Sequence, residues 1–370
     1  MRIAINGLFL QQPATGTGQY LRELVTALRS IAPDDEFTLI APHSDASAPT
    51  TVLVAPTQSQ RENLAKLEFE QITFPRAVNA HRFDAAHVPH FGPPLFPSRP
   101  TVVTVHDLIP LVLPTYRGST LVQLYTRLVS TSARRAHAIL ADSEASARDI
   151  EKYLRIPRAK IHVVYLAAHA RYQTNLAAEE LARVRAQYNL PEHFALYLGG
   201  FDARKNVARL VEAFSHLGTG DWELVLAGKL PERDSDFFPD PRRIAAQYKI
   251  SDRVYFPGFI AEADKPALYA LARVFVYASQ YEGFGLPPLE AMACGTPVIC
   301  ANTSSLLEVV GSAGILLAPD DADAWSDALR EVLCDDARWA QLRALGLTQA
   351  RKFSWERAAR ETLAVYRAVV

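Results

Sequence analysis

The sequence predicts an α/β protein made of two Rossmann-like domains, each a parallel β-sheet flanked by helices. Three observations lead to this fold class. The chain has 370 residues, more than one hydrophobic core usually organises. Short apolar runs of strand length alternate with amphipathic helical patterns along the whole chain. A polar stretch at residues 167–180 divides this alternation into two series, so we expect a first domain at residues 1–170 and a second at residues 171–353.

The first series predicts five strands, and the second series predicts five more. The first five are residues 2–6, 37–41, 85–88, 101–106 and 138–141. The second five are residues 194–198, 224–227, 254–256, 274–278 and 297–300. A helix at residues 19–31 carries Leu21, Leu24 and Leu28 on one face. Ser354 is placed to cap a last helix, which occupies residues 354–370.

The overall composition is that of a soluble globular enzyme, with 49% hydrophobic and 21% charged residues. The 39 basic and 40 acidic residues leave no electrostatic footprint for nucleic acid. The three cysteines show no pairing pattern, and the chain starts with a strand rather than a signal peptide. We therefore expect a cytoplasmic protein with at most peripheral contact to a membrane.

Two glutamates eight positions apart, Glu282 and Glu290, lie in the most informative stretch, residues 281–295. The stretch follows a strand, and Pro287 and Pro288 open a helix within it. The turn before this helix directs backbone N–H groups and the positive end of the helix dipole at one point, which suits a phosphate. The turn residues are Gly283, Phe284, Gly285 and Leu286.

Each glutamate has a place in such a site. Glu282 can face whatever the phosphate carries, and Glu290, about one helical turn in, can accept two hydrogen bonds from a ribose diol. Alone, Glu282 would be interpreted as a solvated loop residue and Glu290 as an ordinary acid in the first turn of a helix. Their occurrence together with three glycines, two prolines and a preceding strand favours a nucleotide site.

Two cations, Arg204 and Lys205, follow Gly199 and Gly200 at the end of the strand at residues 194–198. They precede a helix, where positive charge opposes the helix dipole. A bound diphosphate would remove this conflict, and the pair can neutralise a leaving diphosphate without a metal ion. The alternative is a solvated basic pair.

Near the start of the chain, Gly16, Thr17 and Gly18 open a helix and let the backbone approach an anion. A dinucleotide fingerprint is excluded because Leu21 stands where a third glycine is needed. A flexible loop at a helix start is an equal alternative. His106 and Asp107 end a strand of the first domain, at the edge where open α/β sheets bind ligands.

Other patterns carry less weight. Phe259 follows a strand and can line a nucleotide base, and Ser304 and Ser305 either cap a helix or approach a diphosphate. Asp234 and Asp236 lie in a polar loop, so we expect no metal site there. A helix with Leu121, Leu124 and Leu128 and the arginines Arg117, Arg127, Arg134 and Arg135 is interpreted as an ordinary packed helix, with an anionic membrane as the alternative.

The stretch at residues 281–295 resembles the E-x7-E signature of retaining glycosyltransferases with the GT-B fold, in particular glycosyltransferase family 4. The resemblance spans nearly the whole chain and is closest to bacterial mannosyltransferases that build O-antigen or exopolysaccharide. It implies two Rossmann-like domains with a cleft between them and a last helix that crosses back to the first domain. It also implies transfer of a hexose, most simply mannose from GDP-mannose, to a saccharide or lipid-linked saccharide, with no metal or other cofactor.

The resemblance assigns roles to individual residues. The catalytic set would be Glu282, His106, Arg204 and Lys205. The donor-binding set would be Gly16, Thr17, Gly18, Gly200, Arg204, Lys205, Phe259, Gly283, Phe284, Gly285, Leu286 and Glu290, and the acceptor would meet Asp107 and Tyr116. Many family members have an arginine where this chain has Gly200, which moves the diphosphate contact to Arg204 and Lys205. A nucleotide-sugar epimerase or a phosphorylase of the same architecture is the alternative function.

Overall fold

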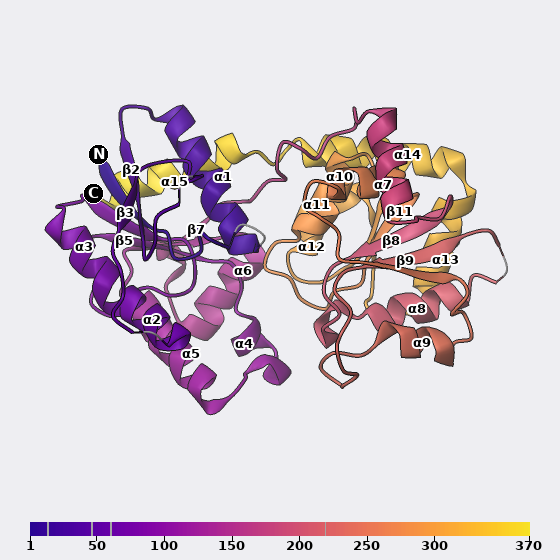
Figure 1. The fold of residues 1–370 in the computed structure, drawn as a ribbon, viewed down its shortest axis with the longest axis horizontal. Coiled ribbons are helices and arrows are strands. Elements are labelled where there is room, and N and C mark those ends of the chain that lie inside the picture. Colours follow the sequence, from indigo (N-terminus) through magenta and orange to yellow (C-terminus); the bar gives the residue numbers. More distant parts are fainter. Residues whose placement is uncertain (13–14, 46, 60, 219) are drawn as a thin grey trace. The chain divides into compact units, whose positions relative to one another are not determined.

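The computed structural model describes residues 1–12, 15–45, 47–59, 61–218 and 220–370, and its chain divides into two compact units (Figure 1). Unit 1 contains Met1–Leu166 and Ser354–Val370, and unit 2 contains Ala167–Phe353. Each unit has its own parallel sheet with helices packed on it, which confirms the predicted α/β class. None of the helices in the described ranges is both long and apolar enough to span a membrane.

Unit 1 is built on a seven-stranded parallel sheet of order β3-β2-β1-β4-β5-β6-β7. Its strands are β1 Arg2–Asn6, β2 Glu36–Ala41, β3 Val52–Val54, β4 Ala85–Val88, β5 Thr101–Val105, β6 Ala138–Ala141 and β7 Ile161–Val163. The inner strands are almost wholly buried, as expected of a parallel sheet covered on both faces. The strand order reverses between β1 and β4, so the loops after these strands meet at one edge.

The helices of unit 1 connect these strands and cover both faces of the sheet. They are α1 Gly16–Ile31, α2 Glu62–Glu68, α3 Phe74–Ala80, α4 Ile109–Val112, α5 Thr120–Ala133, α6 Glu144–Asp149 and the terminal α15 Trp355–Val369. The terminal helix packs against α1, which confirms that the end of the chain returns to the first unit.

A buried row of polar side chains fixes α15 to the sheet of unit 1. The Tyr366 hydroxyl lies 2.6 Å from Nδ1 of His87, and His87 Nε2 lies 2.8 Å from the Thr104 hydroxyl. The Thr104 hydroxyl in turn lies 2.9 Å from the hydroxyl of Tyr20 on α1. Because all four side chains are buried, each depends on the others for its hydrogen bonds.

Replacing Tyr366 by phenylalanine is expected to lower the free energy of unfolding by about 1–3 kcal/mol, because Nδ1 of His87 is left buried without a partner. Urea denaturation of wild type and Y366F measures the change. Arg360→Ala is a control on the same helix, since it removes only an exposed ion pair to Glu356, worth about 0.3–0.5 kcal/mol. Equal losses in the two variants would contradict the importance of the buried row.

Unit 2 has a six-stranded parallel sheet of order β10-β9-β8-β11-β12-β13. Its strands are β8 Phe194–Leu198, β9 Glu223–Ala227, β10 Val254–Gly258, β11 Val274–Tyr277, β12 Val298–Ala301 and β13 Ile315–Leu317. Its helices are α7 Ala178–Gln187, α8 Val207–Ser215, α9 Pro241–Gln247, α10 Lys265–Leu271, α11 Leu286–Ala293, α12 Leu306–Val310, α13 Ala322–Cys334 and α14 Asp336–Ala350.

The strand order of unit 2 reverses between β8 and β11, which pair directly with each other. The loops that follow these two strands therefore leave the same edge of the sheet side by side. The loop after β8 carries the predicted cation pair, and the loop after β11 carries Glu282. The topology thus brings together residues that are almost eighty positions apart in the chain.

Candidate functional site

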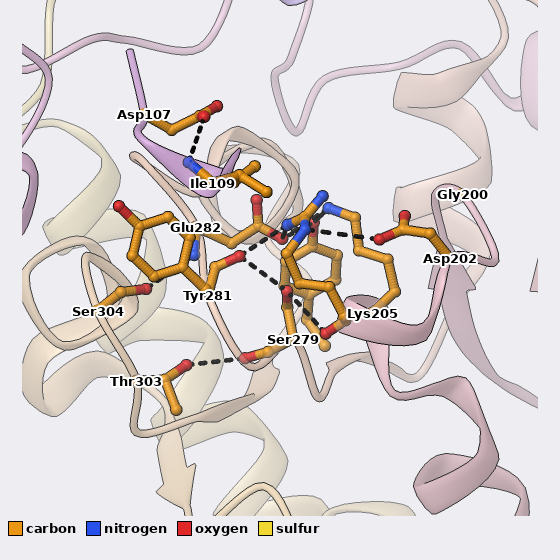
Figure 2. Close-up of polar contacts among 12 residues, drawn as sticks. Asp107, Ile109, Gly200, Asp202, Lys205, Ser279, Tyr281, Glu282, Thr303 and Ser304 are labelled. Atoms are coloured by element: carbon orange, nitrogen blue, oxygen red, sulfur yellow. Dashed lines mark hydrogen bonds and ion pairs between the residues drawn. The ribbon is translucent and has the colours of Figure 1, made fainter. Parts of the chain in front are cut away.

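Glu282 is the centre of a cluster of charged and polar side chains at this edge of unit 2 (Figure 2). Its Oε1 atom accepts a hydrogen bond from Nη1 of Arg204 at 2.8 Å and one from Nζ of Lys205 at 2.6 Å. The hydroxyl of Tyr277, the last residue of β11, donates a third at 2.9 Å. The structure therefore joins the glutamate to both predicted cations.

The cluster is almost entirely removed from solvent. The side chains of Arg204, Lys205 and Glu282 are 10%, 12% and 14% exposed. Burial alone raises the pKa of Glu282, but the charges of Lys205 and Arg204 outweigh it, so the pKa of Glu282 lies below its ordinary value. Glu282 is therefore a carboxylate at neutral pH, held beside two cations.

The cation pair lies on a single 3-10 turn, Ala203–Lys205, just before α8. Acidic side chains of the protein already offset the positive charge of this pair at the helix start. Glu282 pairs with both Arg204 and Lys205, and Asp202 lies 3.5 Å from Nε of Arg204. A diphosphate is thus one of several anions that can balance the two cations. Lys205 has three N–H donors, and the described residues give it two partners, Glu282 and Tyr277. One donor of Lys205 thus remains for a ligand.

Ser304 and Ser305 hold the backbone of Glu282. The Ser304 hydroxyl accepts from the N–H of Glu282 at 2.8 Å, and the Ser305 hydroxyl donates to the carbonyl of Glu282 at 2.9 Å. Ser305 is the N-cap residue of α12, as one interpretation of the sequence predicts, but its side chain makes no capping hydrogen bond to the helix. Two hydroxyls from the loop after β12 fix the position of the acidic loop.

The loop between Glu282 and α11 ends in a glycine that no other residue can replace without strain. Gly285 precedes α11 with φ at +112°, and a Cβ atom there would lie 2.8 Å from Leu306. Pro287 and Pro288 have no N–H group, so among the first three residues of α11 only Leu286 can offer one to an anion. The side chain of Phe284 is buried against Phe353, so only its backbone can face a ligand.

Glu290 lies on α11 and is only 8% exposed. The hydroxyl of Tyr269 donates to its Oε2 atom at 3.0 Å, and the hydroxyl of Tyr172 also bonds to it. Burial raises the pKa of Glu290 above its ordinary value, although Lys265 and the two tyrosines oppose this. The two predicted glutamates therefore have opposite environments, one paired with cations and one surrounded by hydroxyls.

Two further residues predicted for the donor lie in the loops of unit 2. Gly200 is the second residue after β8, and its carbonyl accepts a hydrogen bond from the buried Tyr197 hydroxyl. Phe259 follows β10, and its side chain is 68% exposed. Neither belongs to the cluster around Glu282.

In unit 1, both ring nitrogens of His106 face acceptors. Nδ1 lies 2.8 Å from Oδ2 of Asp142, and Nε2 lies 3.2 Å from the carbonyl of Pro89. Burial lowers the pKa of His106, but the carboxylates of Asp142 and Asp107 and the hydrogen bonds outweigh this and raise the pKa above its ordinary value. The imidazole of His106 is thus set up to hold two protons.

This geometry predicts a pH-dependent contribution to stability. Since the folded pKa of His106 is raised, protonated His106 stabilises the fold fully below the unfolded value of about 6.5, and the gain is lost as the pH rises through the folded pKa. Asp142→Asn is therefore expected to lower the melting temperature more at pH 6 than at pH 9. The exposed Asp252→Asn is the control, and an equal loss at both pH values in D142N would contradict the assignment.

The other predicted residues of unit 1 have local structural roles. Thr15 caps α1 by accepting from the N–H of Gly18 at 3.1 Å, so residues 16–18 form the first turn of this helix. A Cβ atom on Gly18 would lie 2.1 Å from the carbonyl oxygen of Gln12, which explains the glycine without a ligand. Asp107 accepts from the N–H of Ile109 at 3.0 Å, at the start of α4 (Figure 2). Tyr116 lies half-buried in the 3-10 turn Pro114–Tyr116.

Comparison with known proteins identifies the family of the chain. The family description "Glycosyltransferase Family 4" matches residues 14–169, and "Glycosyl transferases group 1" matches residues 179–346. The chain is 32% identical to O-antigen chain mannosyltransferase B of Escherichia coli, over 97% of each chain. The chain belongs to glycosyltransferase family 4. This membership makes it a retaining hexosyltransferase with the GT-B fold.

One further relative and one solved structure are similar to the chain. O-antigen chain mannosyltransferase RfbU of Salmonella typhimurium is 24% identical over 87% of this chain and 88% of its own. The crystal structure of HepE from Anabaena in complex with UDP and glucose covers all of both chains with a TM-score of 0.76 at 19% identity, which shows the same fold. The comparisons thus favour glycosyl transfer over the epimerase and phosphorylase alternatives.

Sequence reasoning missed three tyrosines of this candidate site. Tyr277 donates a hydrogen bond to Glu282, and Tyr269 and Tyr172 bond to Glu290. The one available signal was Tyr277, a tyrosine that ends the strand leading into the acidic loop. The described residues contain no group of three or more His, Cys, Asp or Glu side chains that could hold a metal ion.

Proposed function

We propose that this family 4 glycosyltransferase moves mannose from GDP-mannose to a hydroxyl of a saccharide or lipid-linked saccharide. The proposal rests mainly on the hydrogen bonds of Glu282, whose Oε1 atom accepts from Arg204, Lys205 and Tyr277. The choice of mannose is supported by two relatives whose names describe O-antigen mannosyltransferases. A solved structure with the same fold contains UDP and glucose, so the base and the sugar of the donor are the first properties of this proposal to test.

In this proposal unit 2 holds the nucleotide sugar. Lys205 and Arg204 contact the diphosphate, and the backbone N–H group of Leu286, at the start of α11, donates to the same anion. Glu282 accepts hydrogen bonds from hydroxyls of the sugar, which fixes its orientation. Glu290 binds the ribose diol. Its low exposure and its two tyrosine partners hold the carboxylate in a fixed position, which supports this role.

The roles follow the movement of charge during transfer. As the glycosidic bond to the diphosphate breaks, negative charge grows on the leaving phosphate, and fixed cations stabilise that charge without reorganising. A double-displacement mechanism needs a carboxylate nucleophile beneath the sugar, and we assign none. The acceptor hydroxyl then attacks from the side of the leaving group and gives its proton to the leaving phosphate, which retains the anomeric configuration.

Unit 1 binds the acceptor in this proposal. A pocket of about 650 Å³ opens beside the carboxyl ends of β1 and β2 and offers an aromatic ring, amides and a cation. Phe9, Gln11, Asn63 and Lys66 are among its lining residues. Such a mixture suits a sugar ring, which presents both apolar faces and hydroxyls. Asp107 and Tyr116 do not line this pocket, so their predicted acceptor contacts, like the donor contact of His106, stay predictions.

Thermal unfolding with a panel of nucleotide sugars tests the donor. A donor at 100 times its Kd stabilises the fold by about 2.7 kcal/mol, which raises the melting temperature by a few degrees. We expect GDP-mannose to exceed UDP-glucose, ADP-glucose and dTDP-glucose. A larger shift with UDP-glucose would reject GDP-mannose as the donor. Product analysis by NMR, with and without a mannoside acceptor, then separates transfer from epimerisation or phosphorolysis.

A further inference from the structure

One glutamate of unit 1, Glu70, is buried outside the site described above. Its side chain has an exposed fraction of 0%. It lies in the π-helical turn Phe69–Thr73, which joins α2 to α3. Turns of this kind interrupt regular helices and occur frequently at functional sites. A carboxyl group without contact to water depends wholly on protein partners, so the partners of Glu70 indicate what it holds in place.

Three side chains from separate elements meet at Glu70. The hydroxyl of Tyr125 on α5 donates to both carboxyl oxygens, at 3.0 Å to Oε1 and 2.9 Å to Oε2. Nε2 of His90, in the loop after β4, lies 3.1 Å from Oε1. Burial lowers the pKa of His90, although Glu70 opposes this, so the neutral ring donates its Nε2–H to the carboxylate. The third partner is Lys66 on α2, whose Nζ lies 3.9 Å from Oε1.

Close packing leaves no room for a ligand at Glu70 itself. A Cβ atom on Gly92 would lie 2.5 Å from Oε1 of Glu70, so the loop after β4 covers the carboxylate. Tyr125 covers it from α5. Leu121 and Leu124 of this helix are exposed, so the packing interpretation of the sequence is wrong for both, and Tyr125 is the side chain that turns inward. Glu70 can therefore act on a ligand only through a neighbour.

Lys66 is the partner of Glu70 that reaches the pocket proposed for the acceptor. Its side chain is 38% exposed and lines this pocket, as does Phe9. The ammonium group lies 4.9 Å from the ring centre of Tyr125 and 5.7 Å from that of Phe9. Two aromatic rings and a buried carboxylate thus fix a side chain that is flexible in most settings. The described residues provide no hydrogen-bond acceptor for its three N–H groups.

The charges around the pocket favour a neutral sugar over an anion. Lys66 is the only lysine or arginine among the described residues that line it, and Glu70 already pairs with its charge. Glu62, on the same lining, adds a negative charge. A phosphate or carboxylate of a ligand would therefore meet little uncompensated positive charge. The ammonium group can still donate to adjacent hydroxyls of a sugar whose apolar face rests on Phe9.

We propose that Lys66 binds hydroxyl groups of an uncharged acceptor sugar and that Glu70 is its positioning residue. The Tyr125 hydroxyl and the His90 N–H hold the carboxylate, and the carboxylate holds the ammonium group at the pocket. This inference rests on the proposed function, because it takes the pocket as the acceptor site. It adds the class of acceptor and the side chains that recognise it.

Lys66→Met tests the hydrogen bonds to the acceptor, since methionine keeps the length of the side chain and removes its N–H groups. The KM for a neutral mannoside acceptor is expected to rise by about 10- to 100-fold, because hydrogen bonds from a charged group are lost. The kcat at saturating acceptor should stay within about threefold of wild type, and the Kd of GDP should not change.

Lys152→Met is the matched control for Lys66→Met. Lys152 is also a lysine of unit 1 over a tyrosine, with its Nζ 4.9 Å from the ring centre of Tyr153, but it does not line the pocket. We expect wild-type kinetics from this variant. Lys66→Arg keeps a cation with N–H donors at the pocket and should recover much of the lost affinity.

A double-mutant cycle separates positioning from a general structural role of Glu70. Glu70→Gln is expected to raise the KM for the acceptor by about 10-fold, because the ammonium group loses the charge that fixes it. Combined with Lys66→Met, it should raise KM no further than Lys66→Met alone, since Glu70 acts only through Lys66. Tyr125→Phe removes the hydroxyl that holds the carboxylate and gives the same cycle if Glu70→Gln does not fold. Effects that multiply in both cycles would overturn the positioning role.

Saturation-transfer NMR with methyl α-mannoside measures acceptor binding without turnover. We expect a signal with wild type and K152M that persists in excess inorganic phosphate, and a strongly reduced signal with K66M. No signal with wild type, an equal signal with K66M, or displacement by phosphate would overturn the inference. If this binding pattern holds while GDP-mannose supports no transfer, the proposed function fails in its donor, and the assignment of Lys66 stands.

Discussion

Replacing Glu282 by glutamine is expected to lower kcat by about 100- to 1,000-fold, because Glu282 is the residue that orients the sugar in the proposed mechanism. The amide keeps the shape of the side chain and removes the charge that Arg204 and Lys205 share. Initial rates of mannose transfer with E282Q and wild type measure the effect. Turnover of E282Q close to that of wild type would remove Glu282 from the mechanism.

The same variant has a second expected signature, in the binding of GDP. In the structure Glu282 forms ion pairs with both Arg204 and Lys205. Loss of its charge leaves two mostly buried cations without this partner, which lowers the free energy of unfolding by up to about 3–5 kcal/mol. A diphosphate supplies the missing charge. We therefore expect E282Q to melt lower than wild type alone, to bind GDP at least as tightly by calorimetry, and to regain stability when GDP is added. Weaker GDP binding by E282Q would contradict the competition between Glu282 and the diphosphate.

Replacing Lys205 by alanine is expected to lower kcat/KM by about 100- to 1,000-fold, because a fixed cation beside the leaving phosphate is lost. GDP binding should weaken at the same time. A hydrogen bond to a charged group contributes about 1.5–3 kcal/mol, which corresponds to roughly 10- to 100-fold in Kd. The variants E282Q and K205A therefore differ in direction: both lose turnover, but only K205A loses affinity for GDP.

Lys352→Ala is the matched control for Lys205→Ala, since Lys352 is exposed and lies on the turn after α14. It removes the same charge from unit 2, and we expect no change in turnover or in GDP binding. If K205A bound GDP as tightly as K352A, Lys205 would not contact the diphosphate, and the proposed donor site would lose its principal cation.

Most of the fold could be predicted because the buried strands of a parallel sheet are short apolar runs. The strands β1, β4, β6 and β8 lie where the sequence predicts them. The sequence analysis did not predict β3 and β13, and these are three-residue strands at the edges of their sheets whose side chains are half-buried or exposed. Such strands are formed by pairing with a neighbour, and no local pattern of three residues can show that.

The candidate site could be predicted as two separate motifs but not as one cluster. Each motif follows a strand and carries glycines, which marks it as a ligand loop. That Arg204 and Lys205 share one oxygen of Glu282 depends on β8 pairing with β11, which is a property of the topology. The sequence also could not show that Glu282, from the neighbouring loop, pairs with both cations in this structure, so that a diphosphate is not the only anion that offsets their charge.

A crystal structure with GDP-mannose bound is the most direct test of the proposed donor site. We expect a diphosphate oxygen within hydrogen-bond distance of Nζ of Lys205, the N–H group of Leu286 directed at the phosphates, and Glu282 turned to the sugar hydroxyls. A nucleotide sugar bound without contact to Lys205, Arg204 or Glu282 would contradict the account.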